Sequence, residues 1–306
     1  MTDPKRTTLI LNQSGGTSRG MNSKQFAELV AKRLEATGEQ CTVKLVSGVD
    51  LIGALQETAG DKTTGTIIAA GGDGTVSATA ATCFRAGKTL GVLPLGTMNL
   101  FARSLRLPLD PIAAVEALTT ATSRDLDIAT ANGRPFIHQY SVGLHSRLVK
   151  LRSGMNTSTR LRKLASTLAA LGKVVLDPPR FDLELTIDSH TQRQTLSAIS
   201  VSNNVLTELP APYAERLDTG VLGISCSAAL GTASVIRMTL DAARGKLEDN
   251  PNVDVRTEPR VTLKFPSPPK SLKAAIDGEI VALEREVELI LHAGALRTLV
   301  PAPQPA

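Results

Sequence analysis

Short apolar runs alternate with amphipathic stretches through residues 7–120, and this alternation restricts the fold of that part more than any other feature. A short apolar run is typical of a buried strand, and an amphipathic stretch is typical of a helix that covers a sheet. Strands that alternate with helices form a parallel sheet, because each helix carries the chain back to the edge where the previous strand began. We therefore expect an α/β domain with a doubly wound, mostly parallel sheet over residues 1–124.

Four strands are expected in this first domain, with helices between and after them. The strands are expected at residues 7–12, 42–46, 66–70 and 89–93. A first helix ends at Gly38, and further helices are expected at residues 50–59, 76–86 and 111–120. Asp110 and Pro111 are typical of a helix start, as the N-cap and the first helical residue. In a doubly wound sheet, the loops beyond the carboxyl ends of the strands hold the ligand.

The pattern changes after about residue 124, where apolar and polar residues begin to alternate. Asn132 and Gly133 separate two runs that we expect to be strands, residues 127–131 and 135–142, and Asn-Gly is the strongest short hairpin signal. Helical patterns at residues 159–176 and 232–244 interrupt the alternation. We expect a mainly antiparallel β-sandwich domain over residues 125–295, followed by a tail at residues 296–306 that is free to return to the first domain.

Composition excludes several classes of protein. The chain has 306 residues, 42% hydrophobic and 21% charged, which is enough for two folded domains and excludes a wholly disordered chain. A net charge of +5 suits anionic partners without choosing among them. Aromatic residues make up 3% of the chain, so a stacking surface for nucleic acid is not expected. Cys41, Cys83 and Cys226 form no CxxC pair, and we expect them to be reduced core residues.

The sequence predicts a cytoplasmic protein. The apolar stretch at residues 7–11 is too short for the core of a signal peptide. The longest helical apolar run, residues 164–176, is shorter than the ~20 residues that a bilayer-spanning helix needs.

The sharpest local motif is a glycine-rich loop, Gly71-Gly72-Asp73-Gly74-Thr75, that directly follows the strand at residues 66–70. Glycines at a strand end allow the backbone to approach a phosphate and to direct N–H groups at it. Asp73 adds a carboxylate for a metal or a hydroxyl. For such a motif alone, a tight turn with an aspartate at the helix start is the more frequent explanation.

Two further loops change that balance. The loop after the first strand contains Asn12, Ser14 and Gly15, and the loop after the fourth runs from Gly96 to Asn99. In a parallel sheet these loops converge with the glycine loop at one edge, which indicates a nucleotide-phosphate site. Neither a Walker motif nor the GxGxxG fingerprint is present, which argues against a P-loop NTPase and an ordinary dinucleotide-binding domain.

The chain resembles the diacylglycerol kinase catalytic-domain family, which includes bacterial lipid kinases and sphingosine and ceramide kinases and is related to NAD kinases. The resemblance rests on four motifs in family order: Asn12-x-Ser14-Gly15, the glycine loop, the segment Pro94 to Arg103, and Asp277-Gly278-Glu279. It implies that the first domain binds ATP and that the acceptor hydroxyl lies in a cleft between the two domains.

The resemblance also implies roles for single residues. Asp277 is the expected general base, and Asp73 and Glu279 are the expected ligands of Mg²⁺; without the family motifs, Asp277 and Gly278 indicate only a β-turn. The residues expected to bind the nucleotide are Asn12, Ser14, Gly15, Ser47, Gly71, Gly72, Asp73, Gly74, Thr75, Gly96, Thr97 and Asn99.

The chain departs from the family at three places. Thr219 stands where many bacterial members have an aspartate that helps to hold a structural metal, so a full structural Mg²⁺ site is not expected. Leu144 and His145 follow Gly143 where the family often has Phe-Asp, and Leu100 follows Asn99 where an aspartate is common. Recognition of the acceptor is therefore expected to differ. The four histidines show no metal spacing, and no catalytic role is assigned to them.

A group of basic residues lies at positions 147–163, beside the apolar stretch that begins at Leu164. If these residues share one face, that face suits an anionic membrane surface that presents a lipid. A solvated basic helix face is an equally good interpretation.

The leading hypothesis is an ATP- and Mg²⁺-dependent lipid kinase of phospholipid metabolism, which phosphorylates a hydroxyl of a diacylglycerol-like lipid at the inner face of the membrane. Two alternatives stay open: a kinase of a soluble acceptor such as NAD, and a nucleotide-binding sensor without turnover. A homodimer through edge strands of the second domain is also open.

Overall fold

The computed structural model describes residues 6–14, 22–153, 177–207, 213–243 and 250–302. The chain divides into two compact units. Unit 1 comprises residues 1–128, 213–219 and 292–306, and unit 2 comprises residues 129–212 and 220–291. The sequence prediction gave residues 125–295 to the second domain as one run, whereas residues 125–128, 213–219 and 292–295 belong to unit 1.

Unit 1 is built on a parallel sheet in the strand order β15-β4-β3-β1-β2. The strands are β1 (Arg6–Asn12), β2 (Cys41–Val46), β3 (Thr64–Gly71), β4 (Thr89–Pro94) and the last part of β15 (Glu286–Val300), which pairs with β4 at Thr298 and Leu90. β5 (Thr122–Ala131) pairs with β15 and with β6 (Arg134–Phe136). This arrangement confirms the predicted α/β fold.

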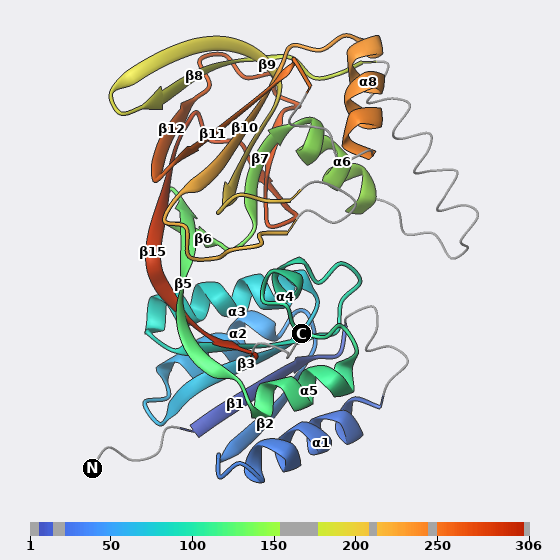
Figure 1. Ribbon diagram of the computed structural model, residues 1–306, viewed down its shortest axis with the longest axis vertical. Helices are drawn as coiled ribbons and strands as arrows, with labels where there is room; N and C mark the ends of the chain where they lie inside the picture. The colour runs from blue at the N-terminus through green and yellow to red at the C-terminus, as the bar shows by residue number, and fades with distance from the viewer. Residues whose placement is uncertain (1–5, 15–21, 154–176, 208–212, 244–249, 303–306) are drawn as a thin grey trace, which may run out of the picture. The chain divides into compact units, whose positions relative to one another are not determined.

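Helices cover both faces of this sheet (Figure 1). α1 (Ser23–Glu35) and α5 (Pro111–Thr119) lie on one face, and α2 (Leu51–Gly60) and α3 (Asp73–Ala86) lie on the other. The short helix α4 (Leu100–Ser104) follows β4. The central strands are buried almost throughout, because a parallel sheet with helices on both faces has no solvent-facing side.

Local capping explains where two of these helices begin. The Asp110 side chain accepts hydrogen bonds from the N–H groups of Ile112 and Ala113, with Pro111 in the first turn, as the sequence predicted. The Asn22 side chain caps α1 in the same way.

Unit 2 is mainly antiparallel, as predicted, with neighbouring strands in the order β14-β13-β7-β9-β8-β12-β15 and with β10 and β11 joined to β9. Its strands are β6 (Arg134–Phe136), β7 (Gln139–Gly143), β8 (Phe181–Ile187), β9 (His190–Asn203), β10 (Leu222–Ala228), β11 (Val253–Glu258), β12 (Arg260–Lys264), β13 (Lys273–Ile276), β14 (Glu279–Ala282) and the first part of β15. Its helices are α6 (Leu144–Ser153) and α8 (Thr232–Ala243).

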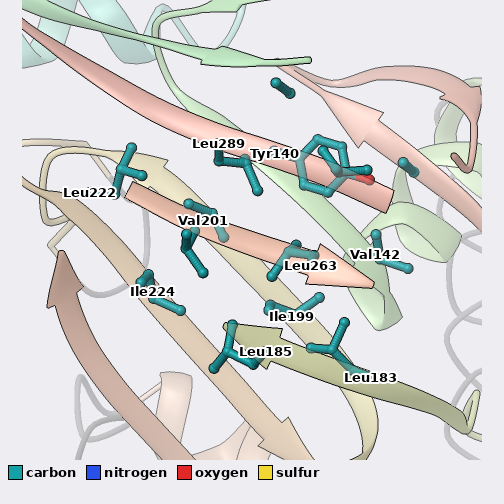
Figure 2. Close-up of a cluster of buried hydrophobic side chains, with 14 of the residues drawn as sticks. Tyr140, Val142, Leu183, Leu185, Ile199, Val201, Leu222, Ile224, Leu263 and Leu289 are labelled. Carbon is teal, nitrogen blue, oxygen red and sulfur yellow. The ribbon is translucent and has the colours of Figure 1, made fainter. Parts of the chain in front are cut away.

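Alternate side chains of these strands form one apolar core, which includes Val142, Leu185, Val201 and Leu263 (Figure 2). The predicted Asn132-Gly133 hairpin is present: both residues have positive φ, and Ala131 pairs with Arg134. The expected strand at residues 135–142 is instead two strands, β6 and β7. The helix predicted at residues 159–176 lies outside the described residues.

The described helices do not include one whose length and apolar character would let it cross a bilayer. 

All three cysteines are free thiols, and burial raises the pKa of each. Desolvation raises the pKa of Cys83 to about 12, whereas an unfolded thiol titrates near ~8.5. Between these two values the folded state keeps the Cys83 proton and the unfolded state loses it. The free energy of unfolding must therefore fall as pH rises through this range.

We expect Cys83 to contribute up to ~1.4 kcal/mol of lost stability per pH unit above pH ~8.5. Urea titrations of the wild type and Cys83→Ala at a series of alkaline pH values test this. The variant should show a smaller decline of stability with pH, and parallel declines would contradict the prediction.

Candidate functional site

The parallel strands of unit 1 end level with one another. Asn12 at the end of β1 pairs with Val46 at the end of β2, and Gly71 at the end of β3 pairs with Pro94 at the end of β4. Leu11 of β1 pairs with Ala70 of β3. The loops that follow these strands therefore lie at one edge of the sheet, where α/β proteins bind ligands.

Asn12 and Ser14 connect three of these segments. The Asn12 Nδ2 donates to Thr75 Oγ1 in α3 at 2.9 Å, and the Asn12 Oδ1 accepts from the Ser14 N–H at 2.9 Å. The Ser14 Oγ in turn accepts from the N–H of Gly48, after β2, at 2.9 Å. The loops after β1 and β2 are thus tied to the first turn of α3.

Asp73 connects the loops after β3 and β4. Its Oδ1 accepts from the Leu100 N–H at 2.7 Å, and its Oδ2 accepts from the Asn99 N–H at 3.1 Å. Hydrogen bonds to an ionised carboxylate are about twice as strong as neutral ones. Asp73 therefore fixes the start of α4 against the start of α3.

Close backbone contact holds the same two loops together. A Cβ at Gly96 would lie 2.6 Å from the Gly72 Cα and 2.8 Å from the Asn99 Oδ1, so no larger residue fits without a backbone shift. The Asn99 amide bonds both the N–H and the C=O of Gly96, and Asn99 itself has φ +51°. Asparagine tolerates this left-handed conformation better than most residues.

The N-terminus of α3 is open to a ligand. No side chain caps it at Gly72, and nothing lies within 4 Å of the position that a Cβ of the exposed Gly74 would take. Within the described part of the chain, no acceptor is bonded to the N–H groups of Asp73 and Gly74. Unbonded N–H groups and the positive end of the helix dipole both favour an anion here.

The structure brings most of the predicted nucleotide residues together at this edge. Thr97 is exposed in the loop between Gly96 and Asn99. Ser47 directly follows β2, and its hydroxyl donates to the Asp50 carboxylate at 2.5 Å. Gly15 lies outside the described residues.

Asp277 and Glu279 belong to unit 2. Asp277 and Gly278 both have positive φ and form the two-residue turn between β13 and β14, where Ile276 pairs with Glu279. Asp277 is therefore a turn residue, as the simpler interpretation of Asp-Gly predicts.

The Asp277 carboxylate also organises a neighbouring segment. Its Oδ2 accepts from the Ile137 N–H at 3.0 Å, and its Oδ1 accepts from the N–H groups of His138 and Gln139 at 2.9 and 3.0 Å. Ile137 and His138 lie between β6 and β7, and their N–H groups bond the Asp277 carboxylate and not a neighbouring strand, so the strand expected at residues 135–142 is interrupted here.

Gln139 extends this arrangement, and sequence reasoning missed it. Its side-chain oxygen accepts from Ser200 at 2.8 Å, and its Nε2 lies 2.8 Å from the His145 Nε2. His145, one of the departures from the family, is thus linked through Gln139 to the Asp277 turn. A single glutamine at a strand start carries no signal that could have singled it out.

Glu279 forms an ion pair with Arg134, whose Nη2 lies 2.6 Å from the Glu279 Oε2. The Glu279 side chain is 71% exposed. Exposed ion pairs contribute little free energy, so this carboxylate can exchange partners at small cost.

Asp218 and Thr219, where the family places a structural metal, lie in unit 1. One Asp218 oxygen lies 3.5 Å from the Arg124 Nη2 and the other lies 3.1 Å from the Arg216 Nε. Both oxygens therefore already face a guanidinium group, and Thr219 supplies no second carboxylate. These residues do not fit a structural divalent cation.

The basic group at residues 147–163 is described only in part. The Arg147 guanidinium donates to the Asp177 backbone oxygen at 2.6 Å and lies 3.6 Å from the Asp177 carboxylate. Arg160, Arg162 and Lys163 lie outside the described residues.

Comparisons of the sequence and of the fold with known proteins agree on one family. Residues 6–131 match the model of the diacylglycerol kinase catalytic domain. A Pseudomonas aeruginosa protein named "Probable lipid kinase YegS-like" is 31% identical over 253 residues, which cover 78% of each chain. A diacylglycerol kinase of Bacillus subtilis is 27% identical over 90% of each chain.

One further relative and a solved structure complete the comparison. An uncharacterized protein of Synechocystis is 27% identical over 220 residues, and this chain spans 50% of its length. The crystal structure of a diacylglycerol kinase from Bacillus anthracis has the same fold, with a TM-score of 0.70 over 99% of both chains at 17% identity. The family model, the extent of the Pseudomonas match and the order of the motifs agree, and the chain belongs to the diacylglycerol kinase catalytic-domain family.

Proposed function

We propose that this protein is an ATP- and Mg²⁺-dependent lipid kinase, which transfers the γ-phosphate of ATP to a hydroxyl of a diacylglycerol-like lipid. Family membership supports a phosphotransferase, and the printed names of the relatives favour a lipid acceptor. The observation that carries the proposal is the open N-terminus of α3, with its uncapped N–H groups and the empty space beside Gly74.

The first step of the proposal is phosphate binding in unit 1. The N–H groups of Asp73 and Gly74 donate to phosphate oxygens, as helix N-termini do in other phosphate sites. The Asn12, Ser14 and Asn99 bonds hold the surrounding loops in place before the nucleotide arrives. Preorganised donors of this kind are what phosphoryl transfer requires of a protein.

Asp73 is the proposed Mg²⁺ ligand in this unit. Each of its oxygens accepts one backbone hydrogen bond and retains lone-pair capacity for a metal. Mg²⁺ is commonly held by one or two carboxylates together with substrate phosphates and waters, and Asp73 suits that arrangement. When bound, the ion would neutralise phosphate charge. Glu279 is the proposed second ligand, and it would have to give up or share Arg134.

Asp277 is the proposed general base. It accepts the proton of the lipid hydroxyl while the hydroxyl oxygen forms a bond to the γ-phosphorus and the bond to the ADP oxygen breaks. Three backbone N–H groups fix the orientation of its carboxylate, so the base does not need to be ordered during the reaction.

We also propose that the enzyme meets its lipid as a cytoplasmic protein attached to the inner face of the membrane. The basic residues at 147–163 would supply the attraction to anionic lipids. Homodimer formation through edge strands of unit 2 remains part of the proposal.

Transfer of labelled phosphate from ATP tests the reaction. With Mg²⁺ and diacylglycerol in mixed micelles, label should appear in the organic phase and depend on the lipid. Label only in the aqueous phase, with NAD as the acceptor, would replace the lipid with a soluble acceptor. ATP binding without any transfer would instead indicate a sensor and would contradict the proposal.

A further inference from the structure

Unit 1 contains a pocket that none of the predicted nucleotide residues lines. Its volume is ≈ 650 Å³, which lies within the ~300–1,000 Å³ typical of small-molecule sites. It is bounded by the connection between α4 and α5, the start of β5, the segment at residues 213–219 and the end of β15. Its apolar wall includes Leu105, Pro108, Leu126, Leu217 and Val300.

Arg106, on the wall of this pocket, occupies a position that normally belongs to glycine. The Arg106 N–H bonds the Arg103 oxygen, and the Leu107 N–H bonds the Ala102 oxygen, which is the Schellman arrangement at the end of α4. The residue at this point must be left-handed, and Arg106 has φ +56°. Glycine adopts this conformation without strain and arginine does not.

Among the described residues, no contact of the Arg106 side chain offsets this backbone strain. It is exposed, and among the described residues no carboxylate or carbonyl is bonded to its guanidinium group. Residues kept in unfavourable backbone conformations are frequent at ligand sites. The unused guanidinium at the wall of a pocket therefore indicates a ligand that carries negative charge.

The other charges of the pocket agree with this interpretation. Arg124 and Arg216 share the single carboxylate of Asp218, so the second positive charge of that group is not neutralised within it. Glu215 is the remaining acidic residue of the lining. The lining therefore carries three arginine side chains and two carboxylates, a net positive charge. The guanidinium fork matches the geometry of phosphate and carboxylate groups.

We propose that this pocket binds an amphiphilic oxyanion, a phosphate or carboxylate group on an apolar body, with Arg106 as the main contact to the charge and Leu126, Leu217 and Val300 around the body. The site is separate from the nucleotide loops and does not depend on the proposed kinase reaction. The Glu215 carboxylate repels the anion and lowers its affinity for the pocket.

Direct binding to the full-length protein tests the proposal, with octyl phosphate and octanoate as probes below their micelle concentrations. Inorganic phosphate and octyl glucoside are the matched probes that lack the apolar body and the charge. Isothermal titration calorimetry should detect at least one of the two amphiphilic anions and neither matched probe, and excess ADP should not displace the bound anion.

Arg106→Gly is the most informative variant, because glycine suits the left-handed position while it removes the charge. We expect its melting temperature not to fall and its affinity for the anion to drop by about 10-fold or more. Arg106→Asn, which also tolerates the left-handed region, should lose affinity to a similar degree. Glu215→Gln should bind the anion more tightly. Ala117→Phe, on the lining, should block binding by filling the pocket.

Arg85→Gln is the control, since Arg85 is an exposed arginine of α3 away from the pocket. It should bind the anion as the wild type does. Unchanged affinity in Arg106→Gly, displacement of the probe by ADP, or equal binding of inorganic phosphate would each overturn the proposal.

Discussion

Asp277→Asn is expected to lower the rate of phosphoryl transfer by ~10²- to 10⁴-fold, the usual contribution of a general base. The amide cannot take the proton of the acceptor hydroxyl. It also presents an NH₂ group where the carboxylate accepts a hydrogen bond from Ile137 or from His138 and Gln139. The free energy of unfolding should therefore fall by about 1–3 kcal/mol.

The two effects of Asp277→Asn can be separated. The rate is measured per folded molecule, at a temperature where denaturant titration shows the variant to be folded. Asp188→Asn is a matched control, because Asp188 occupies the two-residue turn between β8 and β9 with φ +45°, and its side chain forms no hydrogen bond to any described residue. It should keep both rate and stability. A near-normal rate in folded Asp277→Asn would remove Asp277 from the chemical step.

Asp73→Asn should weaken both the loop structure of unit 1 and the binding of ATP. The carboxylate accepts one N–H on each oxygen, from Leu100 and Asn99, and asparagine can replace only one of these bonds. Loss of a charged hydrogen bond costs about 1.5–3 kcal/mol. Because the same turn directs the N–H groups of Asp73 and Gly74, we expect affinity for ATP to fall about 10-fold or more.

Asp110→Asn is the control for this variant. Asp110 also bonds two N–H groups at a helix start, but one oxygen accepts both of them, and asparagine caps helices as well as aspartate does. Denaturant titration and calorimetry with ATP should show Asp110→Asn close to the wild type. Equal losses in the two variants would mean that Asp73 acts only as an ordinary helix cap.

The local pattern of the sequence was sufficient to predict most helices and strands of both units. The Asp110-Pro111 helix start, the Asn132-Gly133 hairpin and the glycine loop after β3 depend on neighbouring residues, and each forms as expected. Because the strands are parallel and end level, the convergence of the loops followed from strand order alone.

Contacts between residues distant in sequence could not be predicted in this way. The Asp277 carboxylate binds N–H groups about 140 residues earlier, and this bonding interrupts the strand expected at residues 135–142. Residues 213–219 return to unit 1 without any change in local pattern. Arg106 gave no signal, because a left-handed helix end is normally marked by glycine.

The most direct test of the account is the transfer of labelled phosphate from ATP to diacylglycerol in mixed micelles by the wild type and four variants. The account predicts label in the organic phase at similar rates with the wild type, Asp110→Asn and Asp188→Asn. At ATP concentrations below saturation, it predicts a much lower rate with Asp73→Asn and with Asp277→Asn. Organic-phase label at the wild-type rate in either of the last two variants, or no lipid label with any protein, would contradict it.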